Sequence, residues 1–400
     1  MGGLMYWRRM LWVLGAWAVS RLVVFADSLR GDVPGDVVHY AQWSAELWAG
    51  SFPVGDENWQ YPPGAALVFL MLGSSPEGYF RRLTLLAALA DALIMLTLLI
   101  ASRRRGEGSL LGPWVWAIAG FAIGPLLLQR YDLVPTLIAV VALALIARPG
   151  ASAALAGLGL VVKVWPAFVL LGLPRRLFWR AGLLAVVVAM AVWGLLALFR
   201  DNSADFLLQQ AKRGLEIEAV AALPLMIAKA AGADITVRGQ FGSWEIAMPL
   251  ASSVALLLTV LSVIALLVLV VARLIGRLEF VPPGDVVLLA VLLFVTTSKV
   301  NSPQFAIWLA GIAAVALVDR RSRMLGVVGL LGLMTFLTNG VIWPQFESLM
   351  TGNPIMVGYQ ALRIALLISA TAWAVTIVLI RPERYVRAED DQGSLLLQRN

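Results

Sequence analysis

The chain has 400 residues, of which 60% are hydrophobic, with a mean hydropathy of +0.85 and a formal net charge of +7 at pH 7. It contains no cysteine, which excludes disulfides, thiolate nucleophiles and cysteine metal sites. The positive charge does not indicate a nucleic-acid partner, because the arginines form short clusters between apolar runs, as topology signals do. Since these runs are continuous rather than alternating, the sequence predicts an all-α polytopic membrane bundle and favours it over a barrel.

The basic clusters predict the course of the chain through the membrane. Arg8 and Arg9 precede the first apolar run, 10–26, which we interpret as a signal anchor. Placing both arginines in the cytoplasm leaves 27–82 outside. The apolar run 64–73 is shorter than the roughly 20 residues that a span needs, so we predict an interfacial helix there. The next predicted segments are 83–101, 112–128, 133–147, a short hairpin over 151–174, and 181–199.

The second half continues the same alternation after a long external loop over 200–246. Its predicted segments are 247–272, 285–298, 304–318, 324–341 and 358–380. About twelve segments thus form one domain, 1–380, followed by a charged cytoplasmic tail, 381–400, and both termini lie in the cytoplasm. The four lysines fall at or toward the external side, against the positive-inside trend. They are Lys163, Lys212, Lys229 and Lys299.

The first external loop contains the stretch "GDVVHYAQW". Helical spacing places Asp36, His39 and Tyr40 on one face. Two interpretations of Asp36 fit equally well: a general base that takes a proton from a bound hydroxyl, or a cap of the helix. His39 fits an interfacial hydrogen-bonded residue better than a catalyst. Trp43 at its end and Trp48 just after it suit an interfacial belt or a platform for sugar stacking equally well.

Three further stretches carry polar residues near the external side. In "QYPPGAA" two prolines fix the backbone, which would hold Tyr61 over a cleft. In "LLLQRYDLVP" the spacing favours an ordinary interfacial salt bridge between Arg130 and Asp132. In "LVVKVWP" Lys163 lies near the tip of the short hairpin, where a lysine must face water, an anion or a carboxylate.

Two later stretches complete the predicted external set. "QQAKRGLEIEAV" carries Arg213, Glu216 and Glu218 in the long loop, where a solvated amphipathic helix is the default prediction. "TTSKVNSPQF" interrupts an apolar run and exposes Lys299 and Gln304 at membrane depth. Irregular backbone at that depth usually lines a cavity.

Two charges lie inside predicted spans. Arg21 is about five residues from the outer end of its helix and Asp91 about eight from the outer end of the next, so at roughly 1.5 Å per residue their depths are similar. We predict a structural ion pair, with contact to a ligand as the alternative.

Taken together, the order of "GDVVHY", "YPPGAA", "QRYDLVP", "VVKVWP", "KRGLEIEA" and "SKVNSPQF" resembles glycosyltransferase family 87, over about residues 20–310. This resemblance implies the GT-C membrane fold and a polyprenyl-phosphate sugar as donor. It also implies that the acid of the first external loop, Asp36, is the catalytic base. The stretch "ITVRGQFGSWEIAMP" at the end of the loop matches no subgroup, which leaves sugar and acceptor open.

The chemistry of such a transfer assigns roles to the remaining charges. The donor leaves as a phosphate dianion that Lys or Arg can neutralise, while a carboxylate deprotonates the acceptor for an inverting displacement. The candidates for the phosphate are Lys163, Arg213 and Lys299, with Arg21 or Arg130 behind them, and Lys163 and Lys299 are the strongest. The predicted substrate-binding set is His39, Tyr40, Tyr61, Arg130, Asp132, Lys163, Arg213, Glu216, Glu218, Lys299 and Gln304. No cofactor or metal is expected, since the carboxylates form no dense cluster.

The sequence therefore predicts a plasma-membrane glycosyltransferase that moves a sugar, preferably mannose, from a polyprenyl-phosphate donor to a lipid-linked glycan or glycolipid on the extracytoplasmic side. The alternatives are an arabinofuranosyltransferase of the same fold, a lipid or solute transporter or flippase, and a non-catalytic assembly subunit. A transporter is disfavoured because the sequence has no internal repeat and its polar groups gather on one side, not at the midplane.

Overall fold

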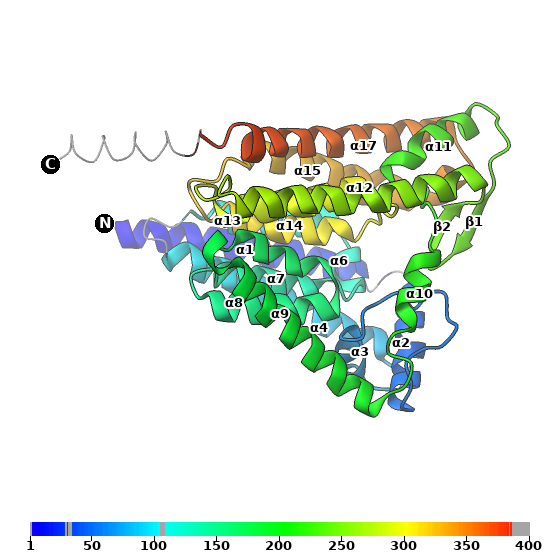
Figure 1. The fold of residues 1–400 in the computed structure, drawn as a ribbon. Coiled ribbons are helices and arrows are strands. Elements are labelled where there is room, and N and C mark those ends of the chain that lie inside the picture. The colour runs from blue at the N-terminus through cyan, green and yellow to red at the C-terminus, as the bar shows by residue number, and fades with distance from the viewer. Residues whose placement is uncertain (1, 29, 31–33, 105–108, 384, 386–400) are drawn as a thin grey trace.

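The computed structural model describes residues 2–28, 30, 34–104, 109–383 and 385. These residues form a bundle of helices, with one small hairpin as the only sheet among them. In Figure 1 the start of α1 and the end of α17 lie at one end of the bundle, and α2, α3, α10 and the strands lie at the other. The predicted tail, 381–400, lies almost entirely outside the described residues.

Six stretches of the described chain are long and apolar enough to cross a membrane. They are formed by α1 (Gly2–Ser28), α4 (Tyr79–Arg104), α9 (Arg175–Phe199), α12 (Pro249–Leu274), the stretch Leu325–Met350, and α17 (Pro354–Val375) with its continuation to Ile380. In α9 and α12 only 17% and 22% of the most apolar window is buried. Helices that are apolar on every side and still exposed are typical of membrane spans, so these two face lipid.

The core consists of shorter apolar helices. They are α5 (Leu111–Ile123), α7 (Leu133–Ala144), α8 (Pro149–Val162), α13 (Pro283–Thr297) and α14 (Phe305–Ala316). Every residue of α14 is buried, and this helix packs against α5, α7 and α13. A Cβ atom on Gly112 of α5 would come within 2.2 Å of the Ala314 carbonyl oxygen of α14. Glycine at this position therefore permits the close approach of the two helices. With the short helices counted, the predicted all-α membrane bundle is confirmed.

The structure follows the predicted segments closely and divides one of them. The hairpin over 151–174 is confirmed: α8 ends at Val162, the backbone is extended at Lys163, and a 3₁₀ helix, η1 (Trp165–Gly172), returns. The segment 112–128 is divided at Gly124, whose φ of 66° ends α5 before α6 (Leu126–Gln129). The run 64–73 forms α3 (Ala65–Met71), which is too short to span, as predicted.

The remaining elements lie mainly near the ends of the bundle. The helix α2 (Gly35–Trp48) follows α1, and the last apolar stretches contain α15 (Leu325–Phe336), the π-helix η3 (Leu337–Ile342), η4 (Trp343–Gln345), α16 (Phe346–Met350) and the π-helix η5 (Thr376–Ile380). The segment 200–246 contains α10 (Asp205–Lys212), η2 (Val220–Ala222), α11 (Leu223–Ala230), β1 (Val237–Gln240) and β2 (Ser243–Ile246).

The two strands form an antiparallel hairpin that pairs Val237 with Ile246. Its tip, Phe241 and Gly242, has φ values of 52° and 65°. Positive φ at both central residues is typical of a two-residue hairpin turn, and it is unusual for a phenylalanine. This unaligned stretch of the sequence therefore forms a compact projection at the end of the bundle that carries α2 and α10 (Figure 1).

The predicted ion pair inside the bundle is confirmed. Arg21 donates from Nε and Nη2 to the two carboxylate oxygens of Asp91, at 3.0 and 2.8 Å. Trp17 donates to the same carboxylate at 2.9 Å, and the Ala117 carbonyl accepts from Arg21 Nη1 at 3.0 Å. A Cβ atom on Gly120 would overlap the guanidinium at 2.2 Å. The two charges thus neutralise each other within α1, α4 and α5, as a buried pair requires.

Candidate active site

Asp36 lies in the first turn of α2, which begins after Pro34. Its side chain caps no backbone N–H, so the interpretation as a helix cap is wrong. The carboxylate instead forms an ion pair with Arg130, which follows α6 in an extended conformation. The Asp36 side chain keeps 32% of its surface exposed, whereas that of Arg130 keeps 7%. Asp36 is therefore oriented by a buried cation and is still accessible to solvent.

Asp132 has a different partner from the predicted one. Its Oδ1 accepts from Lys163 Nζ at 2.6 Å and from Trp308 Nε1 at 2.6 Å. The expected salt bridge between Arg130 and Asp132 is wrong, because each residue turns to a partner on another element. We predicted that Lys163 faces water, an anion or a carboxylate, and the structure shows that it faces a carboxylate.

Aromatic rings enclose the Lys163 ammonium. Its Nζ lies 4.6 Å from the ring centroid of Tyr131, 5.0 Å from Trp308 and 5.5 Å from Tyr61. Rings at these distances attract a cation through their faces, most strongly where water is excluded. The carboxylate and the rings together compensate the lysine charge within the protein. Among the described residues, Asp132 Oδ2 has no hydrogen-bond partner.

Tyr40, on α2, and Tyr61 belong to one aromatic cluster. The Tyr61 and Tyr131 rings meet edge to face, with centroids 5.2 Å apart, and Tyr40 lies 5.8 Å from Tyr131. Burial raises the pKa of Tyr61 to about 12, so its hydroxyl stays protonated near neutral pH. His39 stacks on Trp43 with centroids 5.8 Å apart. Trp43 is itself buried, which is inconsistent with an open platform for a sugar.

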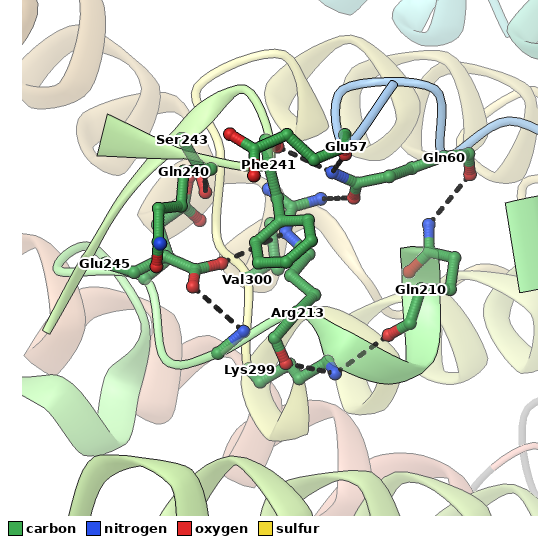
Figure 2. A network of polar contacts seen from close by, with 12 residues as sticks. Glu57, Gln60, Gln210, Arg213, Gln240, Phe241, Ser243, Glu245, Lys299 and Val300 are labelled. Atoms are coloured by element: carbon green, nitrogen blue, oxygen red, sulfur yellow. Dashed lines mark hydrogen bonds and ion pairs between the residues drawn. The ribbon is translucent and has the colours of Figure 1, made fainter. Parts of the chain in front are cut away.

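A second polar network surrounds Arg213, just after α10 (Figure 2). Arg213 Nη1 donates to Gln60 Oε1 at 2.7 Å, and Gln60 Nε2 donates to the Phe241 carbonyl at the hairpin tip at 2.6 Å. Gln210 Nε2 donates to the Gln60 carbonyl at 2.8 Å. The Glu245 carboxylate accepts from the Gly214 amide at 3.0 Å and lies 3.8 Å from Arg213 Nε. This network connects the "QYPPGAA" loop, α10 and the hairpin.

Lys299 joins the same network from the segment between α13 and α14. Its Nζ donates to the Arg213 carbonyl at 2.6 Å and to the Gln210 carbonyl at 3.1 Å. Burial lowers the pKa of Lys299, with the nearby Arg213 adding to the effect and Glu245 opposing it. The charges of Arg213 and Lys299 are thus held largely by neutral acceptors. Gln304 precedes Phe305 at the start of α14, half-buried, and takes part in neither network described above.

Glu216 and Glu218 are buried, so the predicted solvated amphipathic helix is wrong for this part of the loop: α10 ends at Lys212. The Glu216 carboxylate accepts from the Asn301 amide at 2.6 Å and from Ser302 Oγ at 3.1 Å. Glu218 Oε1 accepts from Arg363 Nη1 at 2.6 Å. Burial raises the pKa of Glu218 to about 7, because desolvation outweighs the attraction of the Arg363 guanidinium.

Sequence reasoning overlooked several residues of these networks. They are Gln60, Glu245, Trp308, Gln360 and Arg363. A signal existed for Arg363, because an arginine within the apolar run 358–380 is costly unless it has a partner. None existed for Gln60 or Trp308, whose polar atoms are informative only once the fold brings distant segments together.

Part of the chain is similar to a known protein family. Residues 59–233 match the model of glycosyltransferase family 87. This part of the chain is therefore similar to glycosyltransferase family 87. The match confirms the resemblance read from the motifs, and it covers Tyr61, Asp132, Lys163 and Arg213, whereas Asp36 lies before it.

Two further comparisons concern solved structures and curated sequences. The structure is similar to that of ArnT from Cupriavidus metallidurans bound to undecaprenyl phosphate, with a TM-score of 0.44 and 15% sequence identity. The similarity covers 90% of this chain and 77% of that chain. A search of curated protein sequences finds no match to this chain.

Proposed function

We propose that this membrane glycosyltransferase transfers a sugar, preferably mannose, from a polyprenyl-phosphate donor to a lipid-linked glycan or glycolipid. The observation that carries the proposal is Asp36: a partly exposed carboxylate, oriented by a buried arginine, at the same end of the bundle as the Arg213 and Lys299 cations. The family 87 resemblance supplies the donor class. An external reaction side follows from the positive-inside interpretation of the basic clusters.

In the proposed reaction Asp36 removes the proton of the acceptor hydroxyl. The acceptor oxygen then bonds to the anomeric carbon, and the bond from that carbon to the phosphate oxygen breaks. The configuration of the sugar inverts, and polyprenyl phosphate leaves as a dianion. Cations placed beforehand stabilise the charge that develops on the leaving group.

The contacts favour Arg213 and Lys299 as the groups that meet this phosphate. Lys163 has its charge compensated by Asp132 and three aromatic rings. Arg213 and Lys299 donate instead to a side-chain amide and to backbone carbonyls. The Glu245 carboxylate lies 3.8 Å from Arg213 Nε and compensates only part of the two positive charges, so the remainder is available to an anion. We therefore propose that Lys163 orients Asp132, while Arg213 and Lys299 bind the donor phosphate. The absence of a required metal stays a prediction.

The test compares two aspartates at the same end of the bundle. Asp36→Asn keeps the shape of the side chain and removes its basicity, so turnover of a labelled polyprenyl-phosphate sugar should fall by at least about 10²-fold with donor affinity retained. Asp56→Asn is the matched control, because Asp56 accepts from Trp43 Nε1 at 2.6 Å and serves the loop structure. Normal turnover in Asp36→Asn would show that Asp36 is not the catalytic base.

A further inference from the structure

We infer that Arg363, on α17, is a positioning residue that holds together the two loops carrying Arg213 and Lys299. We call these the site loops, 213–219 and 298–304. The inference rests on the proposed function, since it concerns the site to which we assign the donor phosphate. Arg363 lies outside the residues that match the family model, and it belongs to none of the sequence motifs described above.

The position of Arg363 demands an explanation. It lies within an apolar helix, and only 2% of its surface is exposed. A buried guanidinium is stable only when acceptors surround it, and removal of one partner leaves an uncompensated charge. Its acceptors therefore indicate which segments of the chain Arg363 holds in place.

These acceptors belong to both site loops. Arg363 Nη1 donates to Glu218 Oε1 at 2.6 Å, and Nη2 donates to the Asn301 carbonyl at 2.7 Å. On the same helix, Gln360 accepts from Nη1 at 3.2 Å and donates to the Glu218 carbonyl at 3.1 Å. The planar fork of a guanidinium can bond two partners at fixed angles, which a lysine ammonium cannot reproduce. One side chain thus fixes the distance between the loops.

The connection continues from Arg363 to the cations. The Asn301 amide donates to Glu216 Oε2 at 2.6 Å, and the Glu216 amide donates to the Lys299 carbonyl at 3.0 Å. Lys299 Nζ then donates to the Arg213 carbonyl at 2.6 Å, a contact that Figure 2 shows from close by. Each step joins one site loop to the other. Loss of the Arg363 fork should therefore loosen both loops and separate the cations.

The experiment uses three variants of the full chain in detergent micelles. Arg363→Gln removes the charge and the fork, and Arg363→Lys keeps the charge alone. Arg273→Gln is the matched control, because Arg273 is also 2% exposed and donates to the Leu171 and Leu278 carbonyls near the far end of α12. It reproduces the loss of a buried arginine without touching the site loops.

Two readouts are measured below the unfolding temperature of every variant. Hydrogen exchange at the amides of Glu216 and Asn301 should accelerate at least about tenfold in Arg363→Gln, the scale of one charge-assisted hydrogen bond. The dissociation constant for undecaprenyl phosphate, the probe for the leaving group, should rise by a similar factor. In Arg363→Lys the acceleration of exchange and the rise in the dissociation constant should both be smaller. This variant takes the place of Arg363→Gln if Arg363→Gln does not fold. With a sugar donor, KM should rise more than kcat falls.

The outcomes separate the inference from the proposed function. Unchanged exchange or an unchanged dissociation constant in the Arg363 variants overturns the inference, as does an equal effect of Arg273→Gln. If the wild-type protein binds no undecaprenyl phosphate while the site loops loosen only in the Arg363 variants, the proposed donor is wrong and the role of Arg363 as the tie between the loops is retained.

Discussion

Replacement of Lys163 by methionine should destabilise the protein strongly. Its ammonium lies 2.6 Å from Asp132, whose side chain is only 1% exposed. Without the lysine, the buried carboxylate keeps Trp308 Nε1 as its remaining side-chain donor. Breaking a buried pair in this way costs about 3–5 kcal/mol of unfolding free energy. The loss of the three ring contacts adds on the order of 1 kcal/mol.

A double-mutant cycle separates this effect from the lost volume of the side chain. Lys163→Met together with Asp132→Asn removes both charges, so the double variant should be more stable than Lys163→Met alone, with a coupling energy of about 2 kcal/mol or more. The assay is equilibrium unfolding in mixed micelles followed by tryptophan fluorescence. Lys212→Met, at an exposed lysine, is the control and should stay within about 0.5 kcal/mol of the wild type. A Lys163→Met variant as stable as this control would refute the reasoning.

Three further predictions follow from the geometry. Burial raises the pKa of Glu218 from 4.5 to about 7, so the folded protein binds a proton that the unfolded chain lacks, and stability falls as pH rises through that window. The melting temperature of Glu218→Gln relative to wild type should therefore increase between pH 5 and pH 8, and a decrease would mean that the ion pair outweighs burial. Gln60→Ala leaves Arg213 without its side-chain acceptor and should weaken binding of undecaprenyl phosphate at least about tenfold. Unchanged affinity would show that the network around Arg213 is not part of the phosphate site. Finally, an impermeant thiol reagent on intact cells should label Trp48→Cys and not Arg176→Cys, both at exposed positions at opposite ends of the bundle, and the reverse pattern would invert the orientation.

The sequence predicted best what depends on local composition. Run lengths and arginine clusters predicted the helices and the reversal at Lys163. The pair of Arg21 and Asp91 was also predictable, because two unpaired charges at similar depth in lipid have few other partners.

The choice of partners near the site was not predictable from the sequence. Arg130 and Asp132 are two residues apart, yet they turn to Asp36 and Lys163 on other elements. The acidic stretch after α10 looked solvated because its neighbours in the sequence are polar. Its partners lie far along the chain: Glu216 bonds a residue 85 positions away, and Glu218 bonds one 145 positions away. Local patterns carry no information on contacts of this range.

Consumption of the donor by the purified wild-type protein tests the central claim most directly. The protein is incubated in lipid nanodiscs with an envelope lipid extract as acceptor and with labelled polyprenyl-phosphate mannose or polyprenyl-phosphate arabinose in parallel. We expect loss of the mannose donor, with polyprenyl phosphate released in equal amount to the glycosylated product. If folded protein consumes neither donor and binds no polyprenyl phosphate, the proposed function is wrong.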